Sequence, residues 1–323
     1  MSFEPQSFEP QSPLPSVEPA YRGLGRYGRQ NVAVCVAQLV AWAALLTAID
    51  RSPSPWLTLP LVFAFCAVMQ GVFTLMHEYF HKNAHRSPAA NYVIGVVGAL
   101  LFGTSATLHR INHWGHHVRN RTSAERGEFV HPGESYGGKV LLYYFATMGG
   151  LWVSGILFPI ASLLIPYRSV TWLRAKAEFN TYSAAFAQFG PRDWARMRVE
   201  ALLLICFWGA IIGWGPWRWQ TLAMAYAAFA YHWSVLQWIY HLRTPIDVIE
   251  GAYNLRVPTP VGQLWLNFNC NLTHHRHPAL PWQELPAHTD WKESQPLWYR
   301  YGLMWRPPVP FPDEYSSLEK RYF

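Results

Sequence analysis

The stretch Leu-His-Arg-Ile-Asn-His-Trp-Gly-His-His, residues 108–117, carries His109, His113, His116 and His117. In a helix these positions fall at i, i+4, i+7 and i+8, within a stripe about 100° wide. Four imidazoles on one stripe would repel one another if protonated and would leave ring nitrogens unpaired if buried and neutral. A bound metal resolves both problems, because neutral imidazole is the commonest protein metal ligand. The stretch therefore predicts a metal-binding helix rather than a solvated histidine-rich turn.

Two other short segments repeat this concentration of histidines. They contain His77, His81 and His85, spaced i, i+4 and i+8, and His274, His275 and His277. Together the three segments hold ten of the fourteen histidines within 22 residues, where uniform scatter would place about one. Chance does not explain such clustering, so we expect the three segments to build one site.

The composition is typical of a membrane protein. Hydrophobic residues make up 51% of the chain and charged residues 14%, against roughly 25% charged residues in soluble domains. Seventeen Trp and seventeen Tyr fit this class, since amphipathic rings collect at membrane interfaces. The net charge of +7 is spread along the chain without a nucleic-acid motif, so we expect no nucleic-acid partner. The four cysteines are scattered and show neither CxxC spacing nor a disulfide framework.

Six apolar runs predict the topology, although two of them are poor candidates for crossings. Tyr92–Leu108 and Val140–Ile165 are interrupted by Gly or by Gly and Pro, which favours segments that dip in and return or lie in the interface. With four crossings, 24 of the 26 basic residues fall on the inner side, as the positive-inside rule requires. The four predicted spans are Asn31–Ile49, Trp56–Met76, Val199–Trp214 and Trp217–Tyr240.

The predicted fold is all-α: an integral membrane four-helix bundle of two hairpins, with interfacial or re-entrant helices. A cytosolic helical cap carries the histidine segments. We expect a disordered Pro-rich tail over 1–29, the membrane domain over 30–290 and a C-terminal cytosolic tail over 291–323. Gly23 to Gly28 fit GxGxxG, but no strand precedes them, so a dinucleotide site is not expected.

In this topology the three histidine segments meet at the cytosolic end of the bundle, together with His241 at the inner end of the last span. Eight or more imidazoles exceed the three or four ligands of one zinc ion, which implies two ions. Imidazole suits Zn, Cu, Fe and Ni alike, so ligand type does not fix the metal. A site at the membrane boundary serves an apolar substrate, and O2-dependent chemistry on such a substrate requires a redox metal.

The order HxxxH (His77, His81), HxxHH (His113, His116, His117) and a final HH pair (His274, His275) resembles the membrane fatty acid desaturase and hydroxylase superfamily. The resemblance covers about residues 30–290. It implies that these seven histidines and His241 ligate two iron ions. Asn271 stands where the family usually has His or Gln, so by this resemblance it acts through water rather than by a direct bond to the metal. His85, His109 and His277 exceed the minimum pattern and rank as further ligands or as residues that support the ligands.

By this resemblance the protein uses O2 and two electrons to desaturate a fatty acyl chain. No ferredoxin-like cysteine set and no flavin fold is evident, so the electron donor is a separate protein, a ferredoxin or a cytochrome b5 type with its reductase. We expect a multi-pass protein of a bacterial inner membrane, with both termini and the active site in the cytosol. Carotenoid ketolase or hydroxylase, alkyl-chain hydroxylase and alkene-forming decarboxylase activities remain open on the same scaffold. A metal-cation transporter is a remote alternative.

Carboxylates often orient ligand imidazoles from outside the coordination sphere. Five acidic residues near the histidine segments are candidates for this role, although each one taken alone is more often a surface charge. They are Glu78, Glu125, Glu128, Asp247 and Glu284.

Overall fold

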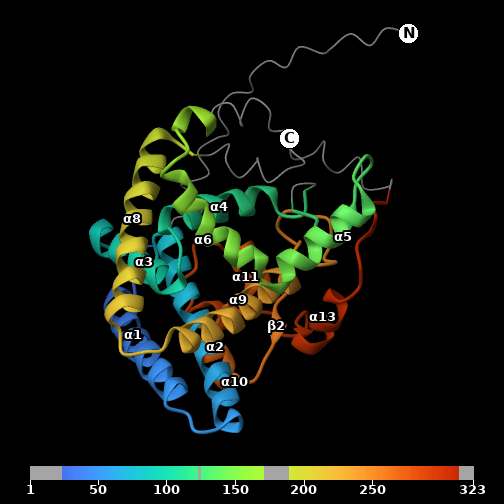
Figure 1. Ribbon diagram of the computed structural model, residues 1–323. Coiled ribbons are helices and arrows are strands. Elements are labelled where there is room, and N and C mark those ends of the chain that lie inside the picture. Colours follow the sequence, from blue (N-terminus) through green and yellow to red (C-terminus); the bar gives the residue numbers. More distant parts are fainter. Residues whose placement is uncertain (1–23, 123–124, 171–188, 313–323) are drawn as a thin grey trace.

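A computed structural model describes residues 24–122, 125–170 and 189–312 (Figure 1). Most of the described chain is helical, and long helices pack into a bundle with shorter helices at one end and side (Figure 1). The prediction of an all-α helical bundle is confirmed. The greater part of the predicted N-terminal tail, residues 1–23, lies outside the described residues, and the first helix begins at Gly28.

The helices and strands follow one another in this order: α1 (Gly28–Asp50), α2 (Pro55–Phe80), α3 (Pro88–Phe102), α4 (Ala106–Arg119), β1 (Phe129–Val130), α5 (Tyr136–Phe145), the π-helical turn η1 (Ala146–Gly150), α6 (Leu151–Ser162), α8 (Pro191–Trp214), α9 (Trp219–His241), β2 (Leu255–Arg256), α10 (Thr259–Leu264), α11 (Asn271–Arg276), α12 (Leu285–His288), β3 (Gln295–Pro296), α13 (Leu297–Met304) and β4 (Val309–Pro310).

Serine side chains define the starts of several helices. Ser87, Ser105 and Ser135 each precede a helix and accept a hydrogen bond from a backbone N–H of its first turn. Such N-caps satisfy amide groups that have no partner inside the helix. Proline at the first position of α3 reinforces the start, because its fixed φ suits a helix and its missing N–H costs nothing there.

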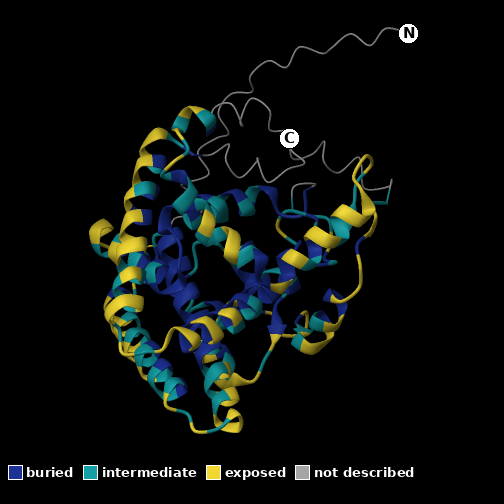
Figure 2. Cartoon of the chain, viewed as in Figure 1, coloured by how far each residue is buried: buried dark blue, intermediate teal, exposed yellow. Residues whose placement is uncertain are grey.

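Within the described residues, four helical segments are long and apolar enough to cross a membrane: α1, α2, α8 and the combined segment Tyr136–Ser162. The bent pair of α3 and α4 makes a fifth if the two helices are counted as one span. Without that pair the number agrees with the predicted four spans, but one member differs. The predicted fourth span, Trp217–Tyr240, forms helix α9, which does not meet the same criterion because Tyr, Trp, His and Gln lower its hydropathy. This composition fits the position of α9, which is largely buried between other helices (Figure 2).

The segment Tyr136–Ser162 is broken rather than continuous. Met148 and Gly149 leave helical geometry, and Gly149 has a φ of 114°, which favours glycine. The two arms, α5 and α6, diverge from this break toward the same end of the molecule (Figure 1). The backbone N–H of Trp152 beyond the break donates to Ser234 Oγ on α9, at 3.3 Å. This shape fits the predicted segment that dips in and returns.

Helices α2 and α9 lie side by side in the centre of the bundle and run in the same direction. Phe65 pairs with Tyr226 at 5.4 Å between ring centroids, and Phe73 pairs with Trp233 at 5.3 Å. At the far end, Asp50 accepts hydrogen bonds from Arg218 and Thr221, which ties the end of α1 to the start of α9. Both α2 and α9 therefore end in histidines at the same end of the bundle.

Helices α3 and α4 meet at a bend of 98°. Gly103 ends α3 in the left-handed conformation, with a φ of 92°, and Ser105 caps α4 two residues later. The buried carboxylate of Glu200 on α8 fixes this corner. It accepts hydrogen bonds from the Tyr92 hydroxyl at 2.8 Å, the Thr107 N–H at 2.9 Å and the Thr107 hydroxyl at 2.7 Å, and a further one from Ser105 Oγ.

The C-terminal segment returns to the bundle through two short parallel strand pairs. β1 pairs with β4, with Phe129 opposite Val309, and β2 pairs with β3, with Leu255 opposite Gln295. These pairings hold α13 against the loops that follow α4 and α9.

The substitution Glu200→Ala should lower the free energy of unfolding by about 3 kcal/mol or more, because it leaves several buried donors without their charged acceptor. Thermal and denaturant unfolding of the purified protein in detergent would measure this loss. Glu134→Ala is the matched control, since Glu134 lies at the surface with Lys139 as its partner and should cost less than about 1 kcal/mol. Equal losses in the two variants would contradict the role assigned to Glu200.

Candidate metal centre

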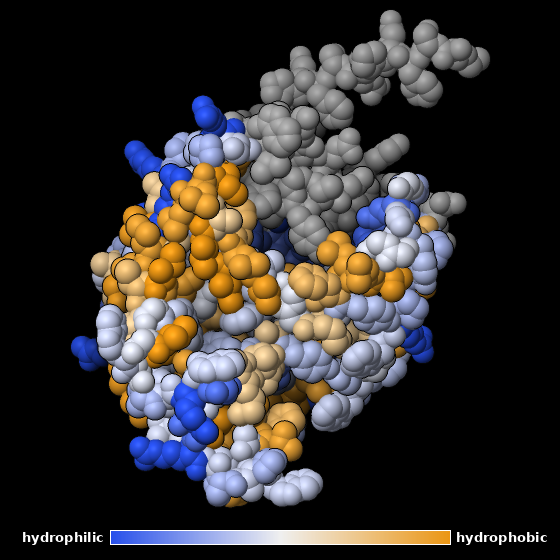
Figure 3. Space-filling model, in the orientation of Figure 1, coloured by the Kyte–Doolittle hydropathy of each residue, from blue (hydrophilic) through white to orange (hydrophobic). Residues whose placement is uncertain are grey.

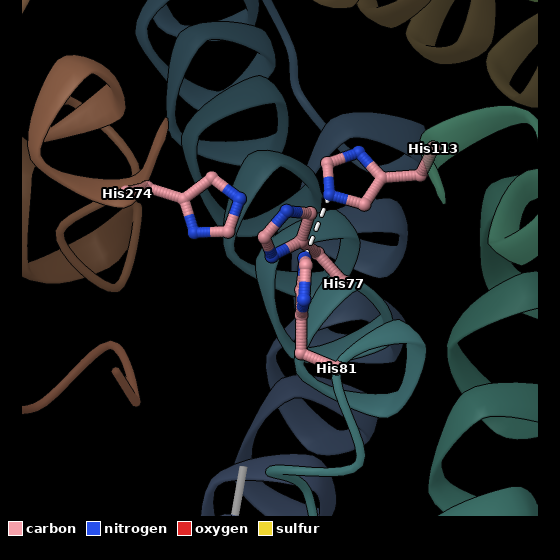
Figure 4. Close-up of side chains that lie close together, drawn as sticks. All are labelled: His77, His81, His113 and His274. Carbon is pink, nitrogen blue, oxygen red and sulfur yellow. Dashed lines mark hydrogen bonds between the residues drawn. The ribbon is translucent and has the colours of Figure 1, made fainter. Parts of the chain in front are cut away.

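Histidines from three separate elements converge at one end of the bundle. His77 and His81 come from the end of α2, His113 from α4 and His274 from α11, and one ring nitrogen of each lies within 4.8 Å of the others. The four rings point toward a common centre (Figure 4). The Nε2 atoms of His81 and His113 are only 2.8 Å apart. We call these four residues the first histidine group.

Three further histidines form a second histidine group beside the first. His116 from α4, His241 at the end of α9 and His275 from α11 offer nitrogens within 4.8 Å of one another. His117 lies close to both groups. Its Nε2 is 2.9 Å from Nε2 of His113, and its ring centroid is 4.8 Å from that of His275. The structure thus brings all eight predicted ligands together at one place.

Hydrogen bonds orient two rings of the second group. Nδ1 of His116 lies 2.5 Å from Glu125 Oε2, and Nδ1 of His241 lies 2.9 Å from the Gly251 carbonyl oxygen. A carbonyl oxygen can only accept, so Nδ1 of His241 carries the proton and leaves the Nε2 lone pair free. A carboxylate at His116 favours the same tautomer. Both rings therefore present Nε2 to the centre of the group, as metal-ligating histidines do.

The loop after α4 is fixed against the loop after α9, which sets the position of His116 relative to His241. Asn120 Nδ2 donates to the Gly251 carbonyl oxygen at 3.1 Å. Gly251 is required there, because a Cβ would collide with Arg121 Cγ. Arg121 also pairs with Glu128 at 2.7 Å, with both side chains 1% exposed. Burial alone would raise the pKa of Glu128, but the charge and hydrogen bond of Arg121 lower it below its ordinary value.

The donor set fits a metal ion. Among the described residues, His77 Nε2 and His275 Nε2 are buried without a hydrogen-bond partner, which is costly unless another ligand completes them. Burial, reinforced by neighbouring imidazoles, holds the pKa of His275 well below its ordinary value of 6.5. Neutral imidazole is the form that binds metals, so this ring is ready to ligate.

Aromatic side chains form one wall of the first group. The ring of His77 contacts Phe268 at 5.3 Å, Phe80 at 5.8 Å and Phe73 at 6.4 Å between centroids. Phe73 and Phe80 belong to α2, whereas Phe268 lies in the segment between α10 and α11. The side of the site that faces the bundle is therefore apolar.

The four further candidates lie outside both groups. His85 is turned toward the start of α1, and its Nδ1 accepts from the Ser87 N–H at 2.9 Å. His109 lies one turn before His113 and packs against Phe102 at 5.2 Å. His277 is exposed, with His288 at 6.2 Å between ring centroids. Asn271 is buried at the start of α11.

Of the five candidate carboxylates, Glu125 contacts one of the predicted ligands directly. Glu284 pairs with Arg26 at 3.1 Å, and Asp247 caps the turn at Ile249 and Glu250. Glu128 acts on the loops rather than on a ring. The acceptor for His241 is a backbone carbonyl group, so no residue type in the sequence could have indicated it.

Comparison with known proteins agrees with this site. No curated protein matches the chain. The model of the fatty acid desaturase family matches residues 54–308, which include both histidine groups and His117. A membrane oxidoreductase of the desaturase and hydroxylase type follows from that match. The chain belongs to the fatty acid desaturase family.

Proposed function

We propose that this protein is a di-iron membrane enzyme that uses O2 and two electrons to desaturate a fatty acyl chain. The observation that carries the proposal is the pair of adjacent histidine groups, with His117 close to both, at the inner end of apolar helices in a member of the desaturase family. Two groups are more than one ion needs, which supports two ions. Iron bound there would supply the redox chemistry that activates O2 for removal of hydrogen from an unactivated C–H bond.

The residues of this chain hold and shape the centre. The first group, His77, His81, His113 and His274, would hold one ion. The second group, His116, His241 and His275, would hold the other, and His117 is placed to serve either. Glu125 and the Gly251 carbonyl oxygen keep the rings of His116 and His241 in the orientation and tautomer that ligation requires.

The aromatic wall formed by Phe73, Phe80 and Phe268 supports an apolar substrate. These rings exclude water from the face of His77 that is turned toward the bundle. An acyl chain lying among the helices would bring a methylene group to this wall, while a polar head group stays in the cytosolic cap. A lipid or acyl thioester is therefore the proposed substrate class.

The electrons would come from another protein. In the described residues no cysteine belongs to either candidate metal group, and all four cysteines are free thiols. A ferredoxin, or a cytochrome b5 type with its reductase, would supply the two electrons of each turnover. We place the active site and both termini in the cytosol, with the helices in a bacterial inner membrane.

Cation transport is disfavoured by the position of the histidines. Transporters hold their ions near the middle of the bilayer, between broken helices. Here His77, His81 and His241 lie at or just beyond helix ends. Hydroxylation, ketolation and decarboxylation use the same kind of centre, so the product decides among these reactions.

The products should identify the reaction. Cells that express the protein with an electron donor should accumulate acyl chains with one additional double bond, detected by mass spectrometry of total lipids, carotenoids and alkanes. A hydroxylated, ketolated or terminally unsaturated product would replace desaturation with the corresponding reaction. Cells that express His113→Ala provide the control.

The substitutions His113→Ala and His275→Ala should each abolish turnover, because each removes a nitrogen from a different histidine group. The protein should remain in the membrane fraction, with its iron content clearly below that of the wild type. Iron analysis of the purified variants, together with product formation, measures both effects. The control is His277→Ala, which changes an exposed ring outside both groups and should retain iron and activity. Wild-type turnover in either of the first two variants would rule out the assigned roles.

The substitution Glu125→Gln should weaken iron binding about 10- to 100-fold without emptying the site, since it removes the charge that supports His116. The rate of iron loss to a chelator measures this change independently of activity. Glu134→Gln, which alters a surface carboxylate, should lose iron at the wild-type rate. If both variants lose iron equally slowly, Glu125 has no such role.

A further inference from the structure

Helix α13 presents an aromatic surface that the proposed reaction does not use. Trp298 is 78% exposed, Tyr299 57% and Trp305 48%. Trp298 and Tyr299 belong to α13, and Trp305 directly follows its last residue. Large exposed aromatic side chains gathered in one short segment indicate a contact site. We call these three residues the aromatic face of α13.

The aromatic face continues onto α5, the first arm of the broken apolar segment. The hydroxyl group of Tyr144 on α5 donates to the Trp305 carbonyl oxygen at 2.9 Å, and that of Tyr143 donates to the Met304 carbonyl oxygen of α13 at 2.7 Å, so the two helices touch. The outer side of α5 exposes Leu141, Leu142 and Phe145. Figure 3 shows apolar side chains gathered over α5 on this side of the molecule.

The inner side of α13 packs against the rest of the molecule and buries the charged residue of the helix. Arg300, the charged residue of α13, is 3% exposed. Its Nε donates to the Ile239 carbonyl oxygen at 3.3 Å, and its guanidinium group lies 4.3 Å from the Tyr253 ring centroid. The Tyr301 hydroxyl forms a hydrogen bond with that of Tyr231 on α9. The helix thus turns Arg300 and Tyr301 inward and leaves Trp298 and Tyr299 exposed.

The residues that α13 contacts give its position along the axis of the bundle. Tyr231, the partner of Tyr301, lies two residues before Trp233, which pairs with Phe73 of α2. At the same level the Thr74 hydroxyl of α2 donates to the Trp265 carbonyl oxygen, at 2.8 Å. Arg300 contacts Ile239 in the last turn of α9, whereas Tyr231 lies near the middle of that helix. Helix α13 therefore lies along the second half of α9, the half that ends in His241.

We propose that the aromatic face of α13 lies in the interfacial layer of the membrane and anchors the cap to the bilayer surface. Trp and Tyr are enriched at this depth, because their rings are apolar while their N–H and O–H groups reach hydrated head groups. The occupant of the surface is lipid rather than a protein, since the aromatic face is continuous with the apolar outer side of α5. The predicted cytosolic tail, 291–323, is then attached to the membrane at Trp298–Trp305.

Spin labelling of the intact, iron-loaded protein in phosphatidylcholine and phosphatidylglycerol nanodiscs tests the proposal. Labels are placed at Trp298→Cys or Tyr299→Cys in a background of Cys35→Ala and Cys206→Ala, since Cys66 and Cys270 are buried. Collision rates with O2, which concentrates in lipid, and with a nickel chelate, which stays in water, report the surroundings of each label. Both target side chains are exposed, so their replacement removes little packing.

Two positions on the same chain calibrate the measurement. Native Cys206, retained in a version that carries Cys35→Ala alone, is exposed on the apolar helix α8 and reports lipid. Lys292→Cys lies on an exposed turn before α13 and reports water. The ratio of O2 to nickel collisions at Trp298→Cys and Tyr299→Cys should exceed that at Lys292→Cys several-fold and approach that at Cys206. A ratio equal to that at Lys292→Cys, or low collision rates with both reagents as under a protein partner, would overturn the proposal.

Discussion

The structure depends on one constraint: many neutral imidazoles must converge where helices from distant parts of the sequence end. A buried imidazole nitrogen without a partner is costly, so a bound ligand would stabilise such a cluster. The central pair, α2 and α9, runs in one direction and therefore delivers His77 and His241 to the same end. Helix α4 crosses that end and contributes to both groups.

The supports of the site are distributed over the molecule rather than confined to the ligands. Glu200 fixes the corner before α4 through four hydrogen bonds, although it lies on α8 and touches no histidine of the two groups. At the other end of α4, the buried pair of Arg121 and Glu128 fixes the loop against the segment that follows α9. Both ends of α4, which carries three of the eight predicted ligands, are thus held by buried carboxylates. Rigid support of this kind is what preserves ligand geometry.

The same arrangement of helices gives the molecule one surface region suited to lipid and another suited to water. The outer sides of α8 and of the arms α5 and α6 are apolar, whereas polar and charged side chains concentrate in the segments around the histidines. Helix α13 lies where the two regions meet and turns Arg300 inward. The proposed function uses this position, because an acyl chain would lie among the apolar helices while a partner in water would supply the electrons.

The sequence by itself determined the helical membrane class, three of its four predicted apolar spans (α1, α2 and α8) and the histidines that share a site, because periodicity and hydropathy are local properties of the chain. It did not determine the division of the eight histidines into two groups, the place of His117 beside both, or the exclusion of His85 and His277. Those depend on which ends meet, which only tertiary packing decides. The backbone acceptor at Gly251 and the central position of helix α9 have the same origin, since both follow from what surrounds a residue rather than from its type.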